Sequence, residues 1–298
     1  MLHNDKILNT YRFMPRIGLG VWQAKNGKEV ESAVESALNA GYRLFDTAAA
    51  YGNEASVGKA ITSSVVPREE IFVTTKLWNA DHGYDKTLKA CDKSLKRLGL
   101  DYIDLFLIHW PAPEAGNYTD TWRAFEKLKK DGKVRSIGVS NFTPDLLDSL
   151  IKNSSVVPAV NQIELHPRFT QQATVEYCQN HGIAVEAYSP LGGAGNDLLK
   201  DATLQEIAKS HSASTAQIII RWHLQRDHIV IPKSTSPKRI AQNIDVYDFS
   251  LNDEEMATID GLDTGERVGA NPEYLNIMLP TRLVQFAHRF GLVHWKKK

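Results

Sequence analysis

Ile103-Asp104-Leu105-Phe106-Leu107-Ile108-His109 is an apolar run with the length of a buried strand, and it ends on a polar side chain. Two earlier runs end in the same way, residues 42–46 on Asp46 and residues 71–76 on Lys76. In a parallel barrel, polar residues at the carboxyl ends of the strands face the active site. The three runs therefore predict a parallel barrel with a site at one mouth.

Short β-rich runs alternate with amphipathic helical windows from residue 17 to residue 245, as in βα units. The expected strands are residues 17–20, 43–46, 71–76, 103–109, 134–140, 159–164, 184–188 and 229–232. The expected helices are residues 29–39, 88–98, 122–130, 144–151, 173–180 and 216–225. Four of these helices are followed by a glycine at the position of a helix stop, namely Gly41, Gly99, Gly132 and Gly182. Eight strands predict a single (β/α)8 TIM barrel over residues 1–275.

The two ends of the chain add to this barrel. A turn-like stretch, Asn9-Thr10-Tyr11, predicts an N-terminal hairpin that plugs the barrel floor. Residues 276–298 fall outside the eightfold count and form a basic amphipathic C-terminal extension. Its cations are interleaved with apolar side chains, namely Arg282, Arg289, Lys296, Lys297 and Lys298 among Leu283, Val284, Phe286, Phe290, Leu292 and Trp295. We expect it to fold over the mouth or to dock a partner, and a frayed tail is the alternative.

Composition excludes several classes of protein. The chain has 298 residues, of which 42% are hydrophobic, and this is enough for one large core. Lys plus Arg and Asp plus Glu both total 35, which argues against a nucleic-acid partner or an anionic membrane surface. Cys91 and Cys178 are isolated, so we expect a reducing, cytoplasmic setting. No stretch of 18 apolar residues occurs, so no membrane span is expected.

Asp46, Tyr51, Lys76 and His109 together suit carbonyl reduction. This reaction delivers a hydride to carbon and a proton to oxygen, and therefore needs a general acid. A tyrosine serves if a nearby ammonium lowers its pKa, so we expect Lys76 to tune Tyr51 and Asp46 to hold Lys76 protonated. His109 is placed to hydrogen-bond the carbonyl oxygen. Taken singly, each residue is better explained as a helix cap, a solvated charge or a core side chain. Their joint placement favours catalysis.

Several further segments carry a resemblance to the aldo-keto reductase family. These are Gly41-Tyr42-Arg43-Leu44-Phe45-Asp46-Thr47-Ala48, Tyr51-Gly52-Asn53-Glu54, Val57-Gly58, Thr75-Lys76-Leu77-Trp78, Ile108-His109-Trp110-Pro111, Gly138-Val139-Ser140-Asn141-Phe142, Asn161-Gln162-Ile163-Glu164-Leu165-His166-Pro167 and Ile231-Pro232-Lys233-Ser234. The resemblance covers residues 7 to 275. It implies NADPH-dependent reduction of aldehydes or ketones, with Tyr51 as general acid, Lys76 and Asp46 as its tuning pair and His109 orienting the substrate. It also implies a monomer.

The expected cofactor site lies in the loops that follow the late strands. No GxGxxG fingerprint opens a βαβ unit, so a Rossmann site is not indicated. A barrel binds phosphates after its last strands, where Lys233-Ser234-Thr235 and Arg239 occur. The resemblance implies that Lys233, Ser234 and Arg239 hold the 2′-phosphate of NADPH, with help from Thr235. It assigns the other contacts as follows: Ser140, Asn141 and Gln162 to the carboxamide, Tyr188 to the nicotinamide ring, Ser189, Leu191 and Gly193 to the pyrophosphate, and Gln242 and Asn243 to the adenine. A solvated basic helix start and ordinary core packing of Tyr188 are the alternatives.

Trp22, Trp78 and Trp110 each follow a segment near the barrel mouth, and aromatic walls suit a small organic carbonyl. They match the family's substrate pocket, and packing is the alternative. The short linker after His109 resembles the compact-loop microbial branch that includes 2,5-diketogluconate reductases and prostaglandin F synthases. An open mouth fits sugars, keto acids, methylglyoxal, diketogluconate or prostaglandin endoperoxide equally.

Three rival functions stay open at this point. One is a barrel that binds NADPH as a sensor or regulatory subunit without turnover, and another is a structural, crystallin-like role. The third is a glycosidase built on Glu164 and Glu186, which would leave Tyr51 and Lys76 unexplained. A metal site is not expected, because His166, His211, His223 and His228 offer no suitable pair.

Overall fold

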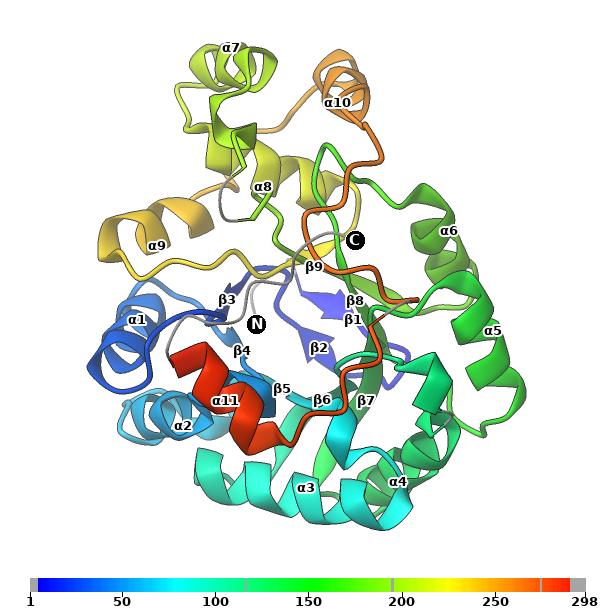
Figure 1. The fold of residues 1–298 in the computed structure, drawn as a ribbon. Helices are drawn as coiled ribbons and strands as arrows, with labels where there is room; N and C mark the ends of the chain where they lie inside the picture. The colour runs from blue at the N-terminus through cyan, green and yellow to red at the C-terminus, as the bar shows by residue number, and fades with distance from the viewer. Residues whose placement is uncertain (1–4, 116, 194–195, 274, 290–298) are drawn as a thin grey trace.

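Eight parallel strands form a barrel (Figure 1), so the predicted strands and the (β/α)8 fold are confirmed. The computed structural model describes residues 5–115, 117–193, 196–273 and 275–289. The strands are β3 (Gly18–Gly20), β4 (Leu44–Asp46), β5 (Phe72–Leu77), β6 (Ile103–Ile108), β7 (Val134–Ser140), β8 (Val160–Glu164), β9 (Ala184–Tyr188) and β10 (Ile229–Val230). Each pairs with the next in chain order. Parallel bridges from Ile17 to Val230 and from Gly20 to Lys233 join the first strand to the last.

The helices surround the strands as an outer ring (Figure 1). They are α1 (Lys28–Asn39), α2 (Glu54–Thr62), α3 (Tyr84–Leu98), α4 (Tyr118–Lys130), α5 (Pro144–Lys152), α6 (Gln172–Asn180), α7 (Ala202–Ser210), α8 (Thr215–Gln225), α9 (Pro237–Ile244) and α10 (Asp253–Asp260). Short 3-10 turns are η1 (Ala49–Tyr51), η2 (Arg68–Glu70), η3 (Asn79–Asp81), η4 (Pro113–Ala115) and η5 (Leu198–Lys200). All six predicted helices are present. Gly99 ends α3 at φ 64°, a left-handed conformation that glycine adopts without steric cost.

Side chains inside the barrel are arranged in layers, because strand residues alternate between the interior and the helices. On β9, Val185 and Ala187 belong to the large core under the helices, whereas Ala184 belongs to the interior cluster. That interior cluster is apolar and includes Leu44, Phe72, Leu105, Leu107, Val160, Ile229 and Ile231. One pleat nearer the carboxyl ends, the interior becomes polar, with Asp46 on β4 and Lys76 on β5. The sequence alternation thus places ionisable groups above an apolar base.

An antiparallel hairpin closes the floor of the barrel, as the sequence predicts. Its strands are β1 (Lys6–Ile7) and β2 (Phe13–Met14). Leu8 and Met14 are 2% and 0% exposed and pack into the interior apolar cluster. The hairpin turn is held by Asn9, whose amide donates to the Pro158 carbonyl oxygen at 3.0 Å. The end of the barrel opposite the polar layer is therefore filled.

The described part of the C-terminal extension, residues 276–289, lies over the mouth at the carboxyl ends of the strands, and we call it the C-terminal strap. It ends in α11 (Thr281–Arg289), which packs on η1 (Figure 1). Val284 of α11 is 3% exposed and clusters with Ala50 and Trp78. Residues 290–298, with Trp295 and the three terminal lysines, lie outside the described part of the chain.

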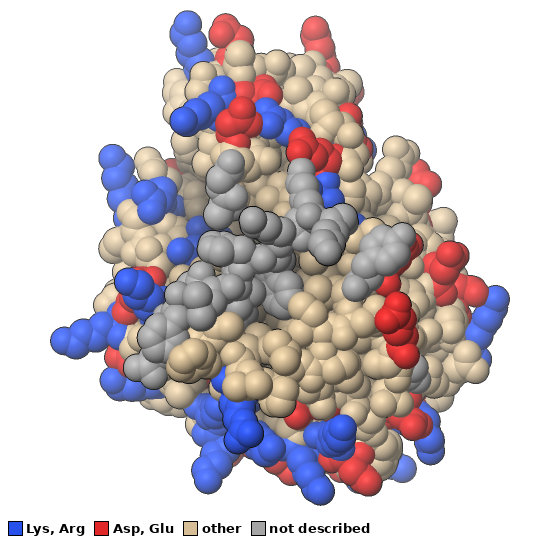
Figure 2. Space-filling view, in the orientation of Figure 1, with Lys and Arg blue, Asp and Glu red and all other residues tan. Residues whose placement is uncertain are grey.

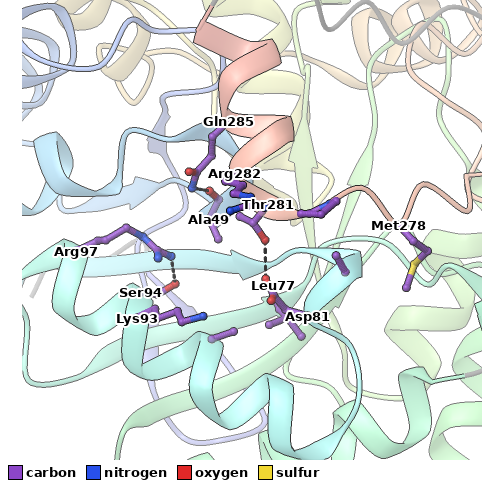
Figure 3. Close-up of a pocket in the computed structure, with 13 residues that line it drawn as sticks. Ala49, Leu77, Asp81, Lys93, Ser94, Arg97, Met278, Thr281, Arg282 and Gln285 are labelled. Atoms are coloured by element: carbon purple, nitrogen blue, oxygen red, sulfur yellow. Dashed lines mark hydrogen bonds between the residues drawn. The ribbon is translucent and has the colours of Figure 1, made fainter.

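A cavity of about 480 Å³ lies beside the strap, between α3, η3 and α11 (Figure 3). Thr281 donates to Asp81 Oδ2 at 2.6 Å across it, and Gln285 donates to the carbonyl oxygen of Ala49 at 2.6 Å. Around the rim of this face of the molecule, cations and carboxylates are interspersed (Figure 2). In the described residues, no helix has the length and apolar character needed to cross a membrane.

Candidate active site

Lys76 is the centre of the site, and its side chain is 0% exposed. Its ammonium nitrogen donates to Asp46 Oδ1 at 2.5 Å and to the carbonyl oxygen of Thr47 at 3.0 Å. It also lies 3.5 Å from the hydroxyl oxygen of Tyr51. A buried ammonium needs a full set of acceptors to offset its lost hydration, and Asp46, Thr47 and Tyr51 provide three. The sequence-predicted Asp46, Tyr51 and Lys76 therefore form one connected group.

His109 completes the predicted set from the end of β6. His109 is 8% exposed, and its ring lies edge-on to the Tyr51 ring, with the two ring centroids 5.6 Å apart. The backbone carbonyl of His109 accepts from Asn141 Nδ2 at 3.0 Å. All four predicted residues thus lie at one mouth of the barrel.

The pKa of Tyr51 differs from the sequence prediction. Burial raises it well above its ordinary value of 10.0, and the charges of Asp46 and Glu186 raise it further. The sequence predicts a lowered pKa through Lys76, but the net shift of Tyr51 is upward, because burial is the largest influence on it. Burial also raises the pKa of Asp46, although Lys76 acts in the opposite direction. Tyr51 therefore keeps its proton at neutral pH, as a proton donor must.

Amide and hydroxyl side chains on β7 and β8 extend the polar layer beyond Lys76. Gln162 donates to Asp46 Oδ2 at 2.9 Å and to Glu186 Oε2 at 2.7 Å. Ser140 donates to the Gln162 carbonyl oxygen at 2.8 Å. Asn141 has a φ of 66°, and its side-chain oxygen accepts from the Tyr188 hydroxyl at 2.9 Å. The predicted carboxamide contacts Ser140, Asn141 and Gln162, together with Tyr188, form one hydrogen-bonded row.

Glu164, one of the two carboxylates of the glycosidase alternative, is committed to a loop. Its oxygens accept from the backbone N–H of Val268 at 2.5 Å and of Gly269 at 2.8 Å, and from His166 Nε2 at 3.2 Å. Burial acts to raise the pKa of Glu164, but these hydrogen bonds hold it below its ordinary value. Both oxygens of Glu164 are therefore occupied in holding the loop, which disfavours a glycosidase pair with Glu186.

The three tryptophans differ in their surroundings. Trp78 is 1% exposed, its ring centroid lies 5.6 Å from that of His109, and its indole N–H donates to the carbonyl oxygen of Leu279 in the strap at 2.9 Å. Trp110 is 7% exposed and belongs to the same apolar cluster. Trp22 follows β3 and is half-buried. The strap thus contacts one of the predicted pocket walls, Trp78.

The predicted phosphate-binding residues lie after β10 and at the start of α9. Lys233 and Arg239 are exposed, and no carboxylate in the described part of the chain pairs with either cation. Ser234 is 5% exposed, and its hydroxyl oxygen accepts from the Ser236 N–H at 3.2 Å. Thr235 is half-buried between Ser234 and Ser236. Two uncompensated cations beside a helix N-terminus fit a phosphate group.

The remaining predicted cofactor contacts lie in the loop that follows β9 and in α9. Ser189 and Gly193 have positive φ values of 49° and 75°, and Leu191 between them is half-buried. In α9, Gln242 is exposed and Asn243 is 6% exposed. The segment from Tyr188 to α9 therefore offers polar groups at both of its ends. In the described residues, no group of three or more histidine, cysteine or acidic side chains is placed to hold a metal ion.

Comparison with known proteins agrees with this geometry. The aldo/keto reductase family matches residues 16–264. The chain belongs to the aldo/keto reductase family. It is 52% identical over 276 residues to the morphine 6-dehydrogenase of Pseudomonas putida, covering 89% of this chain and 93% of that protein. It is 52% identical over 261 residues to the 9,11-endoperoxide prostaglandin H2 reductase of Trypanosoma cruzi, covering 87% of this chain and 92% of that protein.

Solved structures place the chain in the same family. An aldo/keto reductase from Brucella melitensis has a TM-score of 0.84 and 54% identity, covering 87% of this chain and 99% of that chain. An aldo-keto reductase from Bombyx mori in complex with NADP has a TM-score of 0.82 and 42% identity, covering 88% of this chain and 94% of that chain. As a member of this family the chain is an oxidoreductase with a (β/α)8 fold. The strap lies beyond residue 264, the end of the family match.

The sequence prediction did not include Glu186 among the site residues or Thr47 as an acceptor for Lys76. Glu186 is a charged residue in the middle of an apolar strand, Ala184-Val185-Glu186-Ala187-Tyr188. That pattern alone signals a group with a buried partner. The Thr47 contact uses a backbone carbonyl, which every residue has, so no side-chain signal reveals it.

Proposed function

We propose that this protein reduces aldehydes and ketones to alcohols with NADPH, and that Tyr51 gives the proton to the carbonyl oxygen. The observation that carries the proposal is the fully buried Lys76 ammonium between Asp46 and the Tyr51 hydroxyl. Burying an ion pair is costly, so an ion pair held beside a hydroxyl marks that hydroxyl as a candidate functional group. The NADP complex of the Bombyx mori relative and the reductase and dehydrogenase names of the other relatives support it.

NADPH supplies a hydride to the carbonyl carbon when it is bound. The residues of this chain carry out the proton transfer and the orientation. Tyr51 holds its proton at neutral pH because burial and the charge of Asp46 raise its pKa. Lys76 stabilises the phenolate that forms when this proton leaves, and Asp46 holds Lys76 in place. His109 is beside Tyr51, where it can hydrogen-bond the same carbonyl oxygen.

The proposed cofactor contacts extend from the hydrogen-bonded row on β7, β8 and β9 to the cations near the start of α9. We assign the carboxamide to Ser140, Asn141 and Gln162, the ring face to Tyr188, the pyrophosphate to Ser189, Leu191 and Gly193, the 2′-phosphate to Lys233, Ser234, Thr235 and Arg239, and the adenine to Gln242 and Asn243. The uncompensated charges of Lys233 and Arg239 support this direction of binding.

The substrate is a small organic carbonyl held between Trp22, Trp78 and Trp110. We assign residues 276–298 to a C-terminal extension distinct from the barrel, and its strap, residues 276–289, to part of the pocket wall through Leu279 and Val284. We also propose that the protein acts as a monomer in the cytoplasm, where its two buried free cysteines stay reduced.

Substitution Tyr51→Phe tests the function directly. With 4-nitrobenzaldehyde and NADPH, kcat should fall by at least the roughly 100-fold that a positioned acid contributes. Fluorescence titration should show unchanged NADPH binding, because the phenyl ring remains. Tyr84→Phe, at a residue that is 36% exposed on α3, is the matched control and should retain full kcat. Near-normal turnover in Tyr51→Phe would remove Tyr51 from the mechanism, and wild-type NADPH binding without turnover of any carbonyl would support the sensor alternative.

A further inference from the structure

Glu186 is a buried carboxyl group that the proton transfer described above does not use. It lies in the middle of β9 and is 0% exposed. Its neighbours Val185 and Ala187 face the helices, so Glu186 points into the barrel. Its register partner on β8 is Gln162, and its register partner on β10 is Ile229. Glu186 therefore belongs to the polar layer that contains Lys76, one strand beyond Gln162.

A single amide connects Glu186 to the catalytic group. Gln162 Nε2 donates to Glu186 Oε2 at 2.7 Å and to Asp46 Oδ2 at 2.9 Å. An amide nitrogen has two hydrogens, and both are used by these carboxyl groups. A flipped amide would place its carbonyl oxygen against the Asp46 carboxylate and would lose both of these hydrogen bonds, which favours the observed orientation of Gln162. The amide oxygen is thereby left for other partners, and Gln162 holds Asp46 through Oδ2 while Lys76 holds it through Oδ1.

The charge state of Glu186 depends on the groups that face it. These are Asp46 on β4, Lys76 on β5, Tyr51 on η1 and Gln162 on β8. Burial, followed by the charge of Asp46, raises the pKa of Glu186 from 4.5 to about 8, although Gln162 and Lys76 act in the opposite direction. At neutral pH Glu186 therefore carries a proton. Its second oxygen, Oε1, has no hydrogen-bond partner among the described residues and is free to carry that proton.

We propose that Glu186 is a positioning residue, which fixes the Gln162 amide and Asp46 behind Lys76 and, when it ionises, adds a second negative charge that keeps the proton on Tyr51. The inference rests on the proposed carbonyl reduction, because it assigns Glu186 a role through Tyr51. When Glu186 is ionised, its charge raises the pKa of Tyr51. The general acid then stays protonated to higher pH than it would beside Asp46 alone.

Substitution Glu186→Gln tests the charge. The introduced amide keeps an oxygen that can accept from Gln162, but it cannot ionise. In the pH profile of kcat for reduction, the alkaline midpoint should move to lower pH by roughly one unit, the low end of the effect of a nearby like charge. Glu176→Gln is the matched control, because Glu176 accepts from Gln172 at 2.8 Å on the exposed surface of α6. An alkaline midpoint equal to that of wild type would overturn the proposal.

Glu186→Leu is the second variant, because it removes both the charge and the acceptor. It should move the alkaline midpoint in the same direction. It also leaves one Gln162 hydrogen without an acceptor, so the NADPH dissociation constant measured by fluorescence should rise about tenfold, whereas Glu186→Gln should keep the wild-type value. Equal NADPH affinities in the two variants would refute the orientation of Gln162 by Glu186.

Thermal unfolding as a function of pH measures Glu186 without any turnover. The unfolded chain ionises this group near its ordinary 4.5 and the folded chain near 8, so wild type loses stability as the pH rises between these values. The Tm of Glu186→Gln relative to wild type should therefore rise from pH 5 to pH 8 and then level off. A Tm difference that is constant over this range would overturn the proposal. If wild type reduces no carbonyl, the proposed function fails, while this measurement still decides whether Glu186 titrates as inferred.

Discussion

The catalytic side of the barrel and its phosphate side are built in opposite ways. At the ends of β4 and β5, Lys76 and Asp46 are 0% and 2% exposed, and their polar atoms already bond one another. After β10, the cations Lys233 and Arg239 are exposed, and no described carboxylate pairs with them. The first region is complete in the folded chain, whereas the second is completed by an anion.

This difference separates charges that are fixed by folding from charges that are fixed only when a ligand binds. Charges in the catalytic region are held by folding, so that they need no rearrangement when the transition state forms. Charges in the phosphate region stay hydrated until a ligand binds, and therefore contribute to affinity and to cofactor choice. Substitutions in the first region should affect stability and kcat together. Those in the second should affect only the cofactor dissociation constant.

Lys76→Met should have the largest effect. It leaves Asp46 buried without its partner, so we expect a loss of about 3–5 kcal/mol in the free energy of unfolding and a fall in kcat of at least about 100-fold. Urea unfolding and steady-state kinetics measure the two. Lys59→Met is the matched control, because it breaks a 2.8 Å pair with Glu31 in which Lys59 is 66% exposed, and it should cost at most about 1 kcal/mol. Equal losses in the free energy of unfolding for the two variants would contradict the proposed difference between the regions.

Arg239→Ala should have an intermediate effect, confined to NADPH. A guanidinium–phosphate contact contributes about 1.5–3 kcal/mol, so the NADPH dissociation constant should rise roughly 10-fold to 150-fold. NADH lacks the 2′-phosphate and should bind as before. Fluorescence titration of both cofactors at fixed ionic strength checks this, with Lys238→Ala in the same helical turn as control. Equal weakening for both cofactors would assign Arg239 to the fold or to the adenine.

Truncation after Asn276 should have the smallest effect. It tests whether the strap belongs to the folded core or only to the pocket wall. It removes the strap contacts of Leu279 and Val284 with the Trp78 wall. The barrel should fold, because its eight strands are complete before the strap. KM values across a carbonyl panel should change by up to about tenfold, because among the lost hydrogen bonds of the described residues only the one from Trp78 to Leu279 belongs to a predicted pocket wall. A truncated chain that cannot fold would make the strap part of the core.

The sequence predicted most of the fold because its signals are local. Each strand is a short apolar run, and Asp46, Lys76 and His109 mark the strand ends that form the mouth. The closing contact between Ile17 and Val230 is long-range and has no local signal. The pKa of Tyr51 was predicted in the wrong direction because it depends on burial and on the charges of Asp46 and Glu186 nearby, which are properties of the packed structure. Glu186 was placed on its strand correctly, but its link to Asp46 passes through a residue 24 positions away, Gln162.

The N-terminal hairpin, β1 and β2, leaves the barrel interior accessible from one end only. Leu8 and Met14 fill the end opposite the polar layer, so whatever reaches Lys76 must enter and leave through the mouth. The polar row of Ser140 and Gln162 is buried, whereas Trp22 at the rim is half-buried. Two reactants that share one entrance must bind in sequence. The reactant that binds deeper arrives first and departs last. We therefore expect the cofactor to enter before the carbonyl compound, and the alcohol to leave before the spent cofactor.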